Sequence, residues 1–270
     1  MTSMKIKMTK INEEKFNRRF NLFILGGMTL AMVATTAIQL AQGESGTVML
    51  LVAAFGSLMG VLSTVFSANA RILTFLFGFF DVTIYGVMCL MSHNYGNGAL
   101  HLVYFLPMQF IGFWQWRRRG AGSHDRPKAR RLGGSGRVLS SIAFLAGLAV
   151  CYFILWKVSG SASPVDGSGA VKVLKLGILA DAFSTVCNIF GQLLMSMAYM
   201  EQWVFWIGVN VASVAMWTVT LASGDEADSY ALIYLLKYAF YLLNSLNGLR
   251  IWLNLSRPGG GEPVREKTGS

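Results

Sequence analysis

The chain is poor in charged residues. Only 13% of its 270 residues are Asp, Glu, Lys or Arg, whereas 54% are hydrophobic. Soluble domains carry about 25% charged residues, so this composition excludes a soluble enzyme. The apolar residues fall in blocks of about 20, the length that a helix needs to cross about 30 Å of hydrocarbon. Strict alternation of apolar and polar residues is also missing, which excludes a membrane β-barrel.

Residue types that serve catalysis or metal binding are scarce as well. Three cysteines lie inside apolar blocks without a second ligand at metal-binding spacing, and an odd number forms no disulfide framework. Three histidines are scattered, and no phosphate-binding Gly-Lys-Ser/Thr sequence follows the glycines near residue 133. We therefore expect no enzyme, no metal site, no cofactor and no direct use of ATP. The residues concerned are Cys89, Cys151, Cys187, His93, His101 and His124.

The apolar blocks predict an all-α integral membrane protein with eight transmembrane helices. In lipid each backbone polar group must be satisfied within its own segment, so the blocks are helices. The first block is longer than the apolar core of a signal peptide, about 7–15 residues, so we interpret it as a retained helix. The expected spans are 20–41, 47–66, 72–91, 99–117, 138–157, 173–197, 202–222 and 230–253.

The chain has a net charge of +10, and the positions of its basic residues predict how the bundle is oriented in the membrane. Most of the 23 basic residues fall in the N-terminal tail, the loops after the second and fourth spans, and the C-terminal segment. With eight spans these segments all lie on one side, and positive charge collects on the cytoplasmic side of membranes. We therefore expect both termini in the cytoplasm, and no nucleic-acid partner.

Three short matches, in the same order, indicate an internal repeat. Leu62-Ser63-Thr64-Val65 matches Phe183-Ser184-Thr185-Val186, and the third span aligns with the seventh so that Asp81 matches Asn210. Gln109-x-x-Gly112-x-x-x-Trp116 matches Ser245-x-x-Gly248-x-x-x-Trp252. One helix separates the two units, so the repeats are parallel, and such folds commonly place the solute site between them.

These observations predict a 3+1+3 organisation with an extra N-terminal helix. The expected parts are a basic tail at 1–19, the extra helix at 20–41, a first repeat at 47–117, a linker helix at 138–157, a second repeat at 173–253 and a disordered cytoplasmic tail at 254–270.

Polar residues within the spans are the candidates for a solute site, because each is costly in lipid and faces a cavity or a partner. Trp203, Trp206 and Asn210 share one helical face at i, i+3 and i+7. An indole and an amide on one face suit a flat ring with a polar edge. The alternative is an interfacial tryptophan belt with one amide bond between helices.

Further polar stripes lie on four other spans and line either a solute path or a buried hydrogen-bond network. Their ionisable members could form a proton relay, or an Asp could pair with Lys237. The stripes comprise Asp181, Ser184, Asn188 and Gln192; Lys237, Tyr238, Tyr241, Asn244 and Asn247; and Asp81, Tyr85, Tyr104 and Gln109.

Three motifs resemble the PnuC family of vitamin transporters over roughly residues 50–253. Trp203-x-x-Trp206-x-x-x-Asn210 is similar to that family's WxxWxxxN motif. Pro107-Met108-Gln109-x-x-Gly112-x-x-x-Trp116 and Asn244-x-x-Asn247-Gly248-x-x-x-Trp252 resemble the ends of its two repeats. The resemblance implies a duplicated SWEET-like fold in the inner membrane of a bacterium. It also implies facilitated uptake of nicotinamide riboside, which a cytoplasmic kinase traps by phosphorylation for NAD synthesis.

We take the central polar and aromatic residues as the candidate substrate site. Thiamine, riboflavin or a sugar on the same fold, or a membrane receptor without transport, remain alternatives. A Gly56-x-x-x-Gly60 motif and the spare N-terminal helix make a homo-oligomer an expectation. The candidate substrate-binding residues are Trp206, Asn210, Gln109, Asn188, Asn244, Asn247, Tyr241, Tyr104, Asp81, Trp203, Gln192 and Tyr238.

Overall fold

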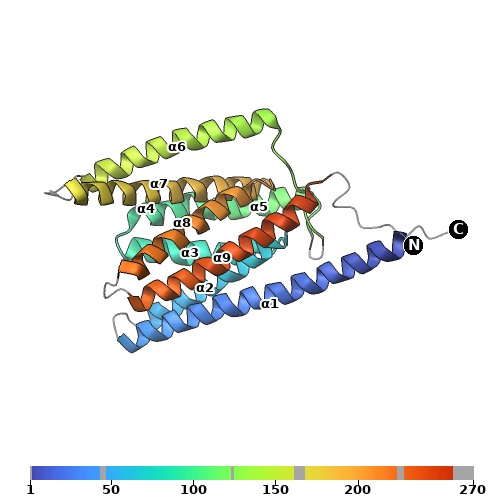
Figure 1. The fold of residues 1–270 in the computed structure, drawn as a ribbon, viewed down its shortest axis with the longest axis horizontal. Coiled ribbons are helices and arrows are strands. Elements are labelled where there is room, and N and C mark those ends of the chain that lie inside the picture. Colours follow the sequence, from blue (N-terminus) through green and yellow to red (C-terminus); the bar gives the residue numbers. More distant parts are fainter. Residues whose placement is uncertain (1, 43–46, 123–124, 161–167, 224–227, 258–270) are drawn as a thin grey trace.

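The described part of the chain is helical throughout its long elements (Figure 1). The structure is a computed structural model and describes residues 2–42, 47–122, 125–160, 168–223 and 228–257. The predicted tail beyond residue 257 lies outside these residues. The helices are α1 (Thr2–Gln42), α2 (Thr47–Ala68), α3 (Thr74–Met91), α4 (Tyr95–Ala99), the π-helix η1 (Leu100–Phe105), α5 (Leu106–Arg118), α6 (Gly134–Gly160), α7 (Ser168–Ser196), α8 (Gln202–Ser223) and α9 (Asp228–Leu255).

Six helices of the described chain are long and apolar enough to cross a membrane. They cover 12–42, 47–68, 74–91, 134–158, 177–196 and 202–222. The most apolar window of α6 has no residue buried inside the protein, as expected of a helix that faces lipid. The first span is part of a longer helix than predicted, because α1 already begins at Thr2 and includes the expected basic tail.

The other two predicted spans differ from simple apolar helices, each for a physical reason. The segment expected at 99–117 is divided among α4, η1 and α5, so no single α-helix there is long enough. The segment expected at 230–253 forms α9, but its lysine, arginine and asparagines lower its mean hydropathy. An all-helical membrane protein with six such spans is therefore what the structure describes.

The division of the fourth segment centres on Pro107. Proline has no backbone N–H and its ring crowds the preceding turn, which breaks the α-helical hydrogen-bond ladder. Just before it the Leu106 N–H donates to the His101 carbonyl, a π-type bond, and η1 results. The Gln109 side chain donates from Nε2 to the Phe105 carbonyl at 3.1 Å. Single π turns often lie at functional sites, and this one faces the interior of the bundle.

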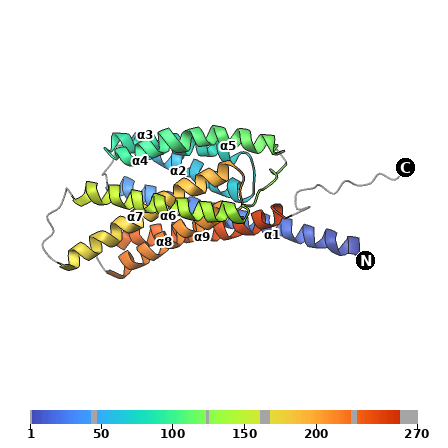
Figure 2. The same ribbon diagram turned by 90° about the horizontal axis from the view of Figure 1, so that it is seen from above.

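The helices form one bundle in which α1 and α6 occupy opposite flanks (Figures 1 and 2). The extra helix α1 packs on α2 and α9, and α6 packs on α7. Between them, α2 contacts α3 and α9, while α8 lies against α7 and α9. Gly56 and Gly60 face the side chains of Ile84 and Asp81 on α3. That GxxxG motif is therefore used within the chain, which removes it as a reason to expect an oligomer.

A tryptophan pair organises the core at the end of the bundle where α5 and α9 finish. The Trp116 indole donates from Nε1 to the Met195 carbonyl on α7 at 2.8 Å. The Trp252 indole donates to the Ser67 carbonyl on α2 at 3.0 Å. Both tryptophans are fully buried, and their ring centroids lie 5.3 Å apart. Each indole N–H has the partner that a buried donor needs.

The connection between α5 and α6 docks across this same end. Arg130 joins residues 198–200 through two backbone bonds, from its N–H to the Ala198 carbonyl at 2.7 Å and from the Met200 N–H to its carbonyl at 2.9 Å. Burial and the neighbouring Arg71 lower the pKa of Arg126 below its usual range, and Glu14 opposes them.

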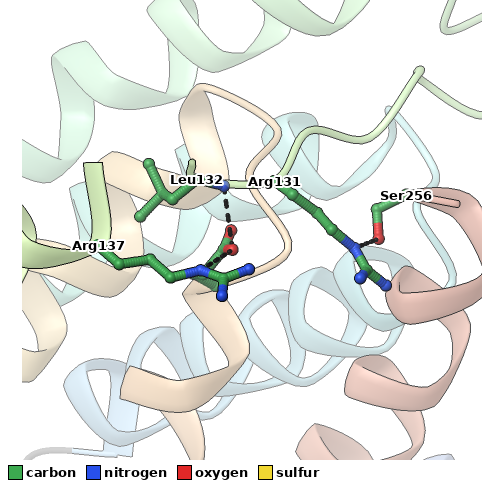
Figure 3. A network of polar contacts seen from close by, with 5 residues as sticks. Arg131, Leu132, Arg137 and Ser256 are labelled. Carbon is green, nitrogen blue, oxygen red and sulfur yellow. Dashed lines mark hydrogen bonds and ion pairs between the residues drawn. The ribbon is translucent and has the colours of Figure 1, made fainter. Parts of the chain in front are cut away.

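Side-chain contacts attach this connection to residues next to α8 and at the end of α9, and Figure 3 shows Arg131 beside Ser256. A Glu201 carboxylate oxygen accepts from the Leu132 N–H at 3.0 Å and lies 3.8 Å from Arg137. Arg131 donates to the Ser256 hydroxyl at 2.7 Å and to the Leu253 carbonyl at 3.1 Å. The basic segment is thus a fixed part of this end of the bundle.

Candidate functional site

A cavity of about 300 Å³ lies inside the bundle between α2, α3, η1, α5, α7, α8 and α9. Of the twelve predicted site residues, ten line it, so the scattered polar positions of five spans converge on one space. Its lining consists of Gly60, Ser63, Thr64, Ser67, Gly78, Asp81, Val82, His101, Phe105, Gln109, Asn188, Gln192, Met195, Trp203, Trp206, Val209, Asn210, Tyr238, Tyr241, Asn244 and Ser245.

Helix α8 supplies the aromatic wall of the cavity. The Trp206 indole lies against Gly191 of α7, where an added Cβ would come within 2.9 Å of the ring. Asn210, one turn further along, donates from its amide nitrogen to the Ser245 hydroxyl at 2.9 Å. Trp203 is only 3% exposed and packs against Gly248 of α9, so it is a core residue at the cavity edge rather than part of an interfacial belt.

Two amide oxygens in the wall have no hydrogen-bond partner within the described chain. Gln109 Oε1 and Asn244 Oδ1 are both buried and unpartnered, although each amide nitrogen is used. Gln109 donates to the Phe105 carbonyl, and Asn244 donates to the Thr64 carbonyl at 3.1 Å. Buried acceptors are nearly always satisfied in proteins. Each oxygen is buried, so a small side-chain movement would bring it to the N–H or O–H groups of a bound solute.

The predicted stripe on α7 is divided. Asn188 and Gln192 reach the cavity, but Asp181 and Ser184 do not line it. The Asn188 amide donates to the Ser184 carbonyl at 2.8 Å, and the Gln192 amide donates to the Ser196 hydroxyl at 3.3 Å. The half of the stripe nearer the tryptophan pair is the half that faces the interior.

Asp81 is the one carboxylate among the described lining residues. It lies beside Gly60 of α2, where an added Cβ would be 2.7 Å from a carboxylate oxygen. Tyr238 and Tyr241 of α9 line the same part of the cavity. Lys237 interacts electrostatically with Asp81 but is not part of the lining. The cavity therefore combines one acidic group with an aromatic wall and several amides.

Two predicted residues lie outside the cavity lining. The Tyr104 hydroxyl donates to the Ile189 carbonyl at 2.8 Å and so joins η1 to α7. The Asn247 amide oxygen accepts from Arg250 at 3.2 Å, on the same helix. Tyr104 therefore holds η1 against α7, and Asn247 orients Arg250, which also donates to Asn17 of α1.

The lining also contains residues that the sequence analysis did not select. Ser63, Thr64 and Ser67 of α2 are small hydroxyl residues that resemble packing positions. His101 was set aside as isolated, although it lies at i−8 from Gln109, with Phe105 between them at i−4, on the same face. That shared face was the signal that could have identified it.

An interior polar cavity enclosed by apolar helices long enough to span a membrane is the arrangement expected of a solute transporter. The chain belongs to the nicotinamide mononucleotide transporter family, whose profile matches residues 50–254. This is a family of membrane transporters and not of enzymes, as the composition predicted.

Several relatives carry a more specific name. The chain is 30% identical to a nicotinamide riboside transporter PnuC of Neisseria mucosa over 215 residues, which are 78% of this chain and 74% of the relative. It is 25% identical to the protein of the same name from Escherichia coli, over 86% of this chain and 98% of the relative. A crystal structure of the vitamin B3 transporter PnuC matches with a TM-score of 0.61 and 27% identity, covering 89% of this chain and 91% of that one.

Proposed function

We propose that the chain mediates facilitated diffusion of nicotinamide riboside through the described cavity. The observation that carries this proposal is the pair of unpartnered amide oxygens, Gln109 Oε1 and Asn244 Oδ1, in a cavity that also contains Trp206 and Asp81. The carboxamide and ribose hydroxyls of the solute supply donors for the two oxygens. The names of the relatives identify the same solute.

The charge of the solute also fits the lining. Its pyridinium ring is a flat cation, which an indole face attracts through stacking and cation–π contact. The Asp81 carboxylate supplies the opposite charge in a site away from bulk water. The amides of Asn188, Gln192 and Asn210 remain for the other polar groups of the solute.

The lining disfavours the phosphorylated form of the same solute. Among the described residues it includes neither arginine nor lysine, the side chains that normally pair with phosphate. A phosphate group would also be close to the carboxylate of Asp81. We therefore propose the riboside, rather than the mononucleotide in the family description, as the solute. A cytoplasmic kinase that phosphorylates it would prevent its return.

The proposed fold is an eight-helix 3+1+3 arrangement with α1 as the extra helix and α6 as the linker. Two matching contacts support it: Gly112 receives the Phe75 ring, and Gly248 receives the Trp203 ring, with an added Cβ at 2.2 Å and 2.5 Å. The crossed bonds of the tryptophan pair, described above, support it as well, because each joins the last helix of one unit to the first helix of the other.

The Phe75 and Trp203 contacts support an alignment of the two repeats that differs in part from the alignment given by the sequence matches. Ala70 and Ala198 both adopt positive φ, 53° and 59°, just after α2 and α7. Pairing them aligns Phe75 with Trp203, so Asp81 corresponds to Val209 and not to Asn210. The match of Gly112 with Gly248 keeps its register. The sequence similarity between the third and seventh spans is short and lies in apolar helices, so it does not exclude an alignment shifted by one residue.

For orientation, we propose that the end carrying Arg130 and Arg131 faces the cytoplasm of a bacterium, across its inner membrane, in accordance with the positive-inside rule. The first residues of α1 and the end of α9 lie at this end (Figure 1). A homo-oligomer stays a prediction, to be measured by the mass of the detergent-solubilised protein.

Uptake of labelled nicotinamide riboside into proteoliposomes without an ion gradient tests the function. We expect the label to equilibrate, and to accumulate only when a riboside kinase and ATP are enclosed. Unlabelled nicotinamide mononucleotide, thiamine and riboflavin serve as competitors, and we expect each to compete weakly. Accumulation without the kinase would contradict facilitated diffusion, and absence of uptake by folded protein would contradict the solute.

A further inference from the structure

A second cavity, of about 520 Å³, lies between α1 and the helices α2, α3 and α9. Gln39 near the end of α1 and Ser92 and Asn94 after α3 contribute to its wall. These residues lie at the end of the bundle opposite the basic connection (Figure 1). The second cavity therefore occupies the part of the bundle between that end and the candidate site.

Three side chains line both cavities and form the partition between them. They are Asp81 of α3 and Tyr238 and Tyr241 of α9. The first cavity extends from this partition to Ser67 and Met195 next to the tryptophan pair. The two cavities together thus follow the length of the bundle, and these three side chains border both of them.

Lys237 lies on the second-cavity side of the partition, inside a set of tyrosines. Its ammonium nitrogen is 5.8 Å from the ring centroid of Tyr234 and 5.9 Å from those of Tyr238 and Tyr241. Three aromatic rings around one positive charge are the arrangement that binds organic cations. Asp81 adds an electrostatic attraction to the same ammonium group.

We propose that the second cavity is an outer subsite for a flat organic cation, and that Lys237 is a tethered cation which occupies the tyrosine set until the solute displaces it. The subsite has the aromatic and acidic chemistry of the inner cavity. When the solute cation lies against the tyrosines, Asp81 keeps a positive partner and the Lys237 ammonium withdraws into the wider part of the second cavity. The identity of the cation as nicotinamide riboside rests on the proposed function.

The charge of Lys237 is the first test. Lys237→Met removes the ammonium group but keeps a long flexible side chain, and Lys237→Arg keeps a positive charge. We expect the Met variant to bind nicotinamide riboside about tenfold more tightly, because the competitor for the tyrosines is gone. Binding of the uncharged dihydro form should change less than twofold. Equal changes for both forms, or unchanged affinity for the cation, would overturn the proposal.

Filling the second cavity is the second test. Ala54 of α2 lines it, whereas Leu51 of the same helix is 55% exposed on the outside. We expect Ala54→Trp to slow uptake into proteoliposomes at least tenfold while the equilibrium affinity of the solubilised protein changes less than threefold. Leu51→Trp, the matched control, should leave both unchanged.

The outcomes separate the two proposals. If the wild-type protein transports nicotinamide riboside and Ala54→Trp transports it equally fast, the outer subsite is wrong and the proposed function stands. If the folded wild-type protein neither binds nor transports the riboside, the proposed function fails, and the assignment of this cation to the subsite fails with it.

Discussion

The side-chain amide nitrogen of Asn244 on α9 donates to the Thr64 carbonyl on α2 at 3.1 Å, while the amide oxygen of Asn244 is buried without a partner in the described chain. One side chain thus joins two helices and keeps an unpartnered acceptor beside the cavity. Asn244→Ala removes both, and we expect the affinity for the riboside to fall about tenfold or more, because a hydrogen bond to a buried polar group contributes about 1–3 kcal/mol. Calorimetric titration of the solubilised protein measures this. Asn254→Ala, at the exposed end of the same helix, is the matched control.

Trp206 tests the aromatic wall. Trp206→Ala should weaken binding of the riboside about tenfold, since stacking and cation–π contact together contribute about 1–2 kcal/mol. Trp206→Phe should retain part of the affinity because a smaller ring remains. Trp114→Ala, at a position that is 52% exposed on the outside, should have no effect. Equal affinities for the wild-type, Ala and Phe proteins would remove Trp206 from the site.

The proposed function predicts that Asp81 selects for a positively charged solute. Asp81→Asn keeps the shape of the side chain and removes its charge. We expect the affinity for nicotinamide riboside to fall about tenfold and that for the uncharged dihydro form to stay within about twofold, because only the cation loses an electrostatic partner. Competition binding with both forms measures the ratio. A ratio that stays at the wild-type value would show that the carboxylate does not select for charge.

Gly248 tests the packing at the basic end. An added Cβ would come within 2.5 Å of the Trp203 ring, so Gly248→Ala forces the buried indole to shift. We expect a loss of about 1–3 kcal/mol of stability, as for other overpacked cores. Gly26 has open space around it and serves as control. The melting temperature in detergent should fall for Gly248→Ala and stay unchanged or rise for Gly26→Ala.

The positions of the candidate site residues were largely predictable, because a polar side chain in an apolar helix avoids lipid and faces the interior of the bundle. That rule brought Gln109, Asn188 and Asn244 to one cavity from three separate segments. It did not separate residues that line the cavity from residues whose side chains bond elsewhere in the protein. Tyr104 and Asn247 satisfied the same rule and instead bond to the Ile189 carbonyl and to Arg250.

The details of the helices were less predictable, for reasons of local chemistry. Pro107 lies within an apolar block, and its effect on the hydrogen-bond ladder is a π-helix that hydropathy does not detect. Helix α9 carries Lys237 and Arg250, so it resembles a polar helix although it lies beside α2 and α8. The three tyrosines around Lys237 are its neighbours on the same helix at i−3, i+1 and i+4, so the spacing predicts the cluster but not the second cavity that it lines.

The lack of arginine and lysine in the described cavity lining has a consequence for the direction of flow. A passive pore for one solute runs equally well both ways, and the protein itself holds no energy source in this proposal. If the proposed function holds, phosphorylation of the riboside inside the cell gives a product that the lining disfavours, and that product cannot return by the same path. The direction of net transport would then be set by a kinase inside the cell and not by the transporter itself.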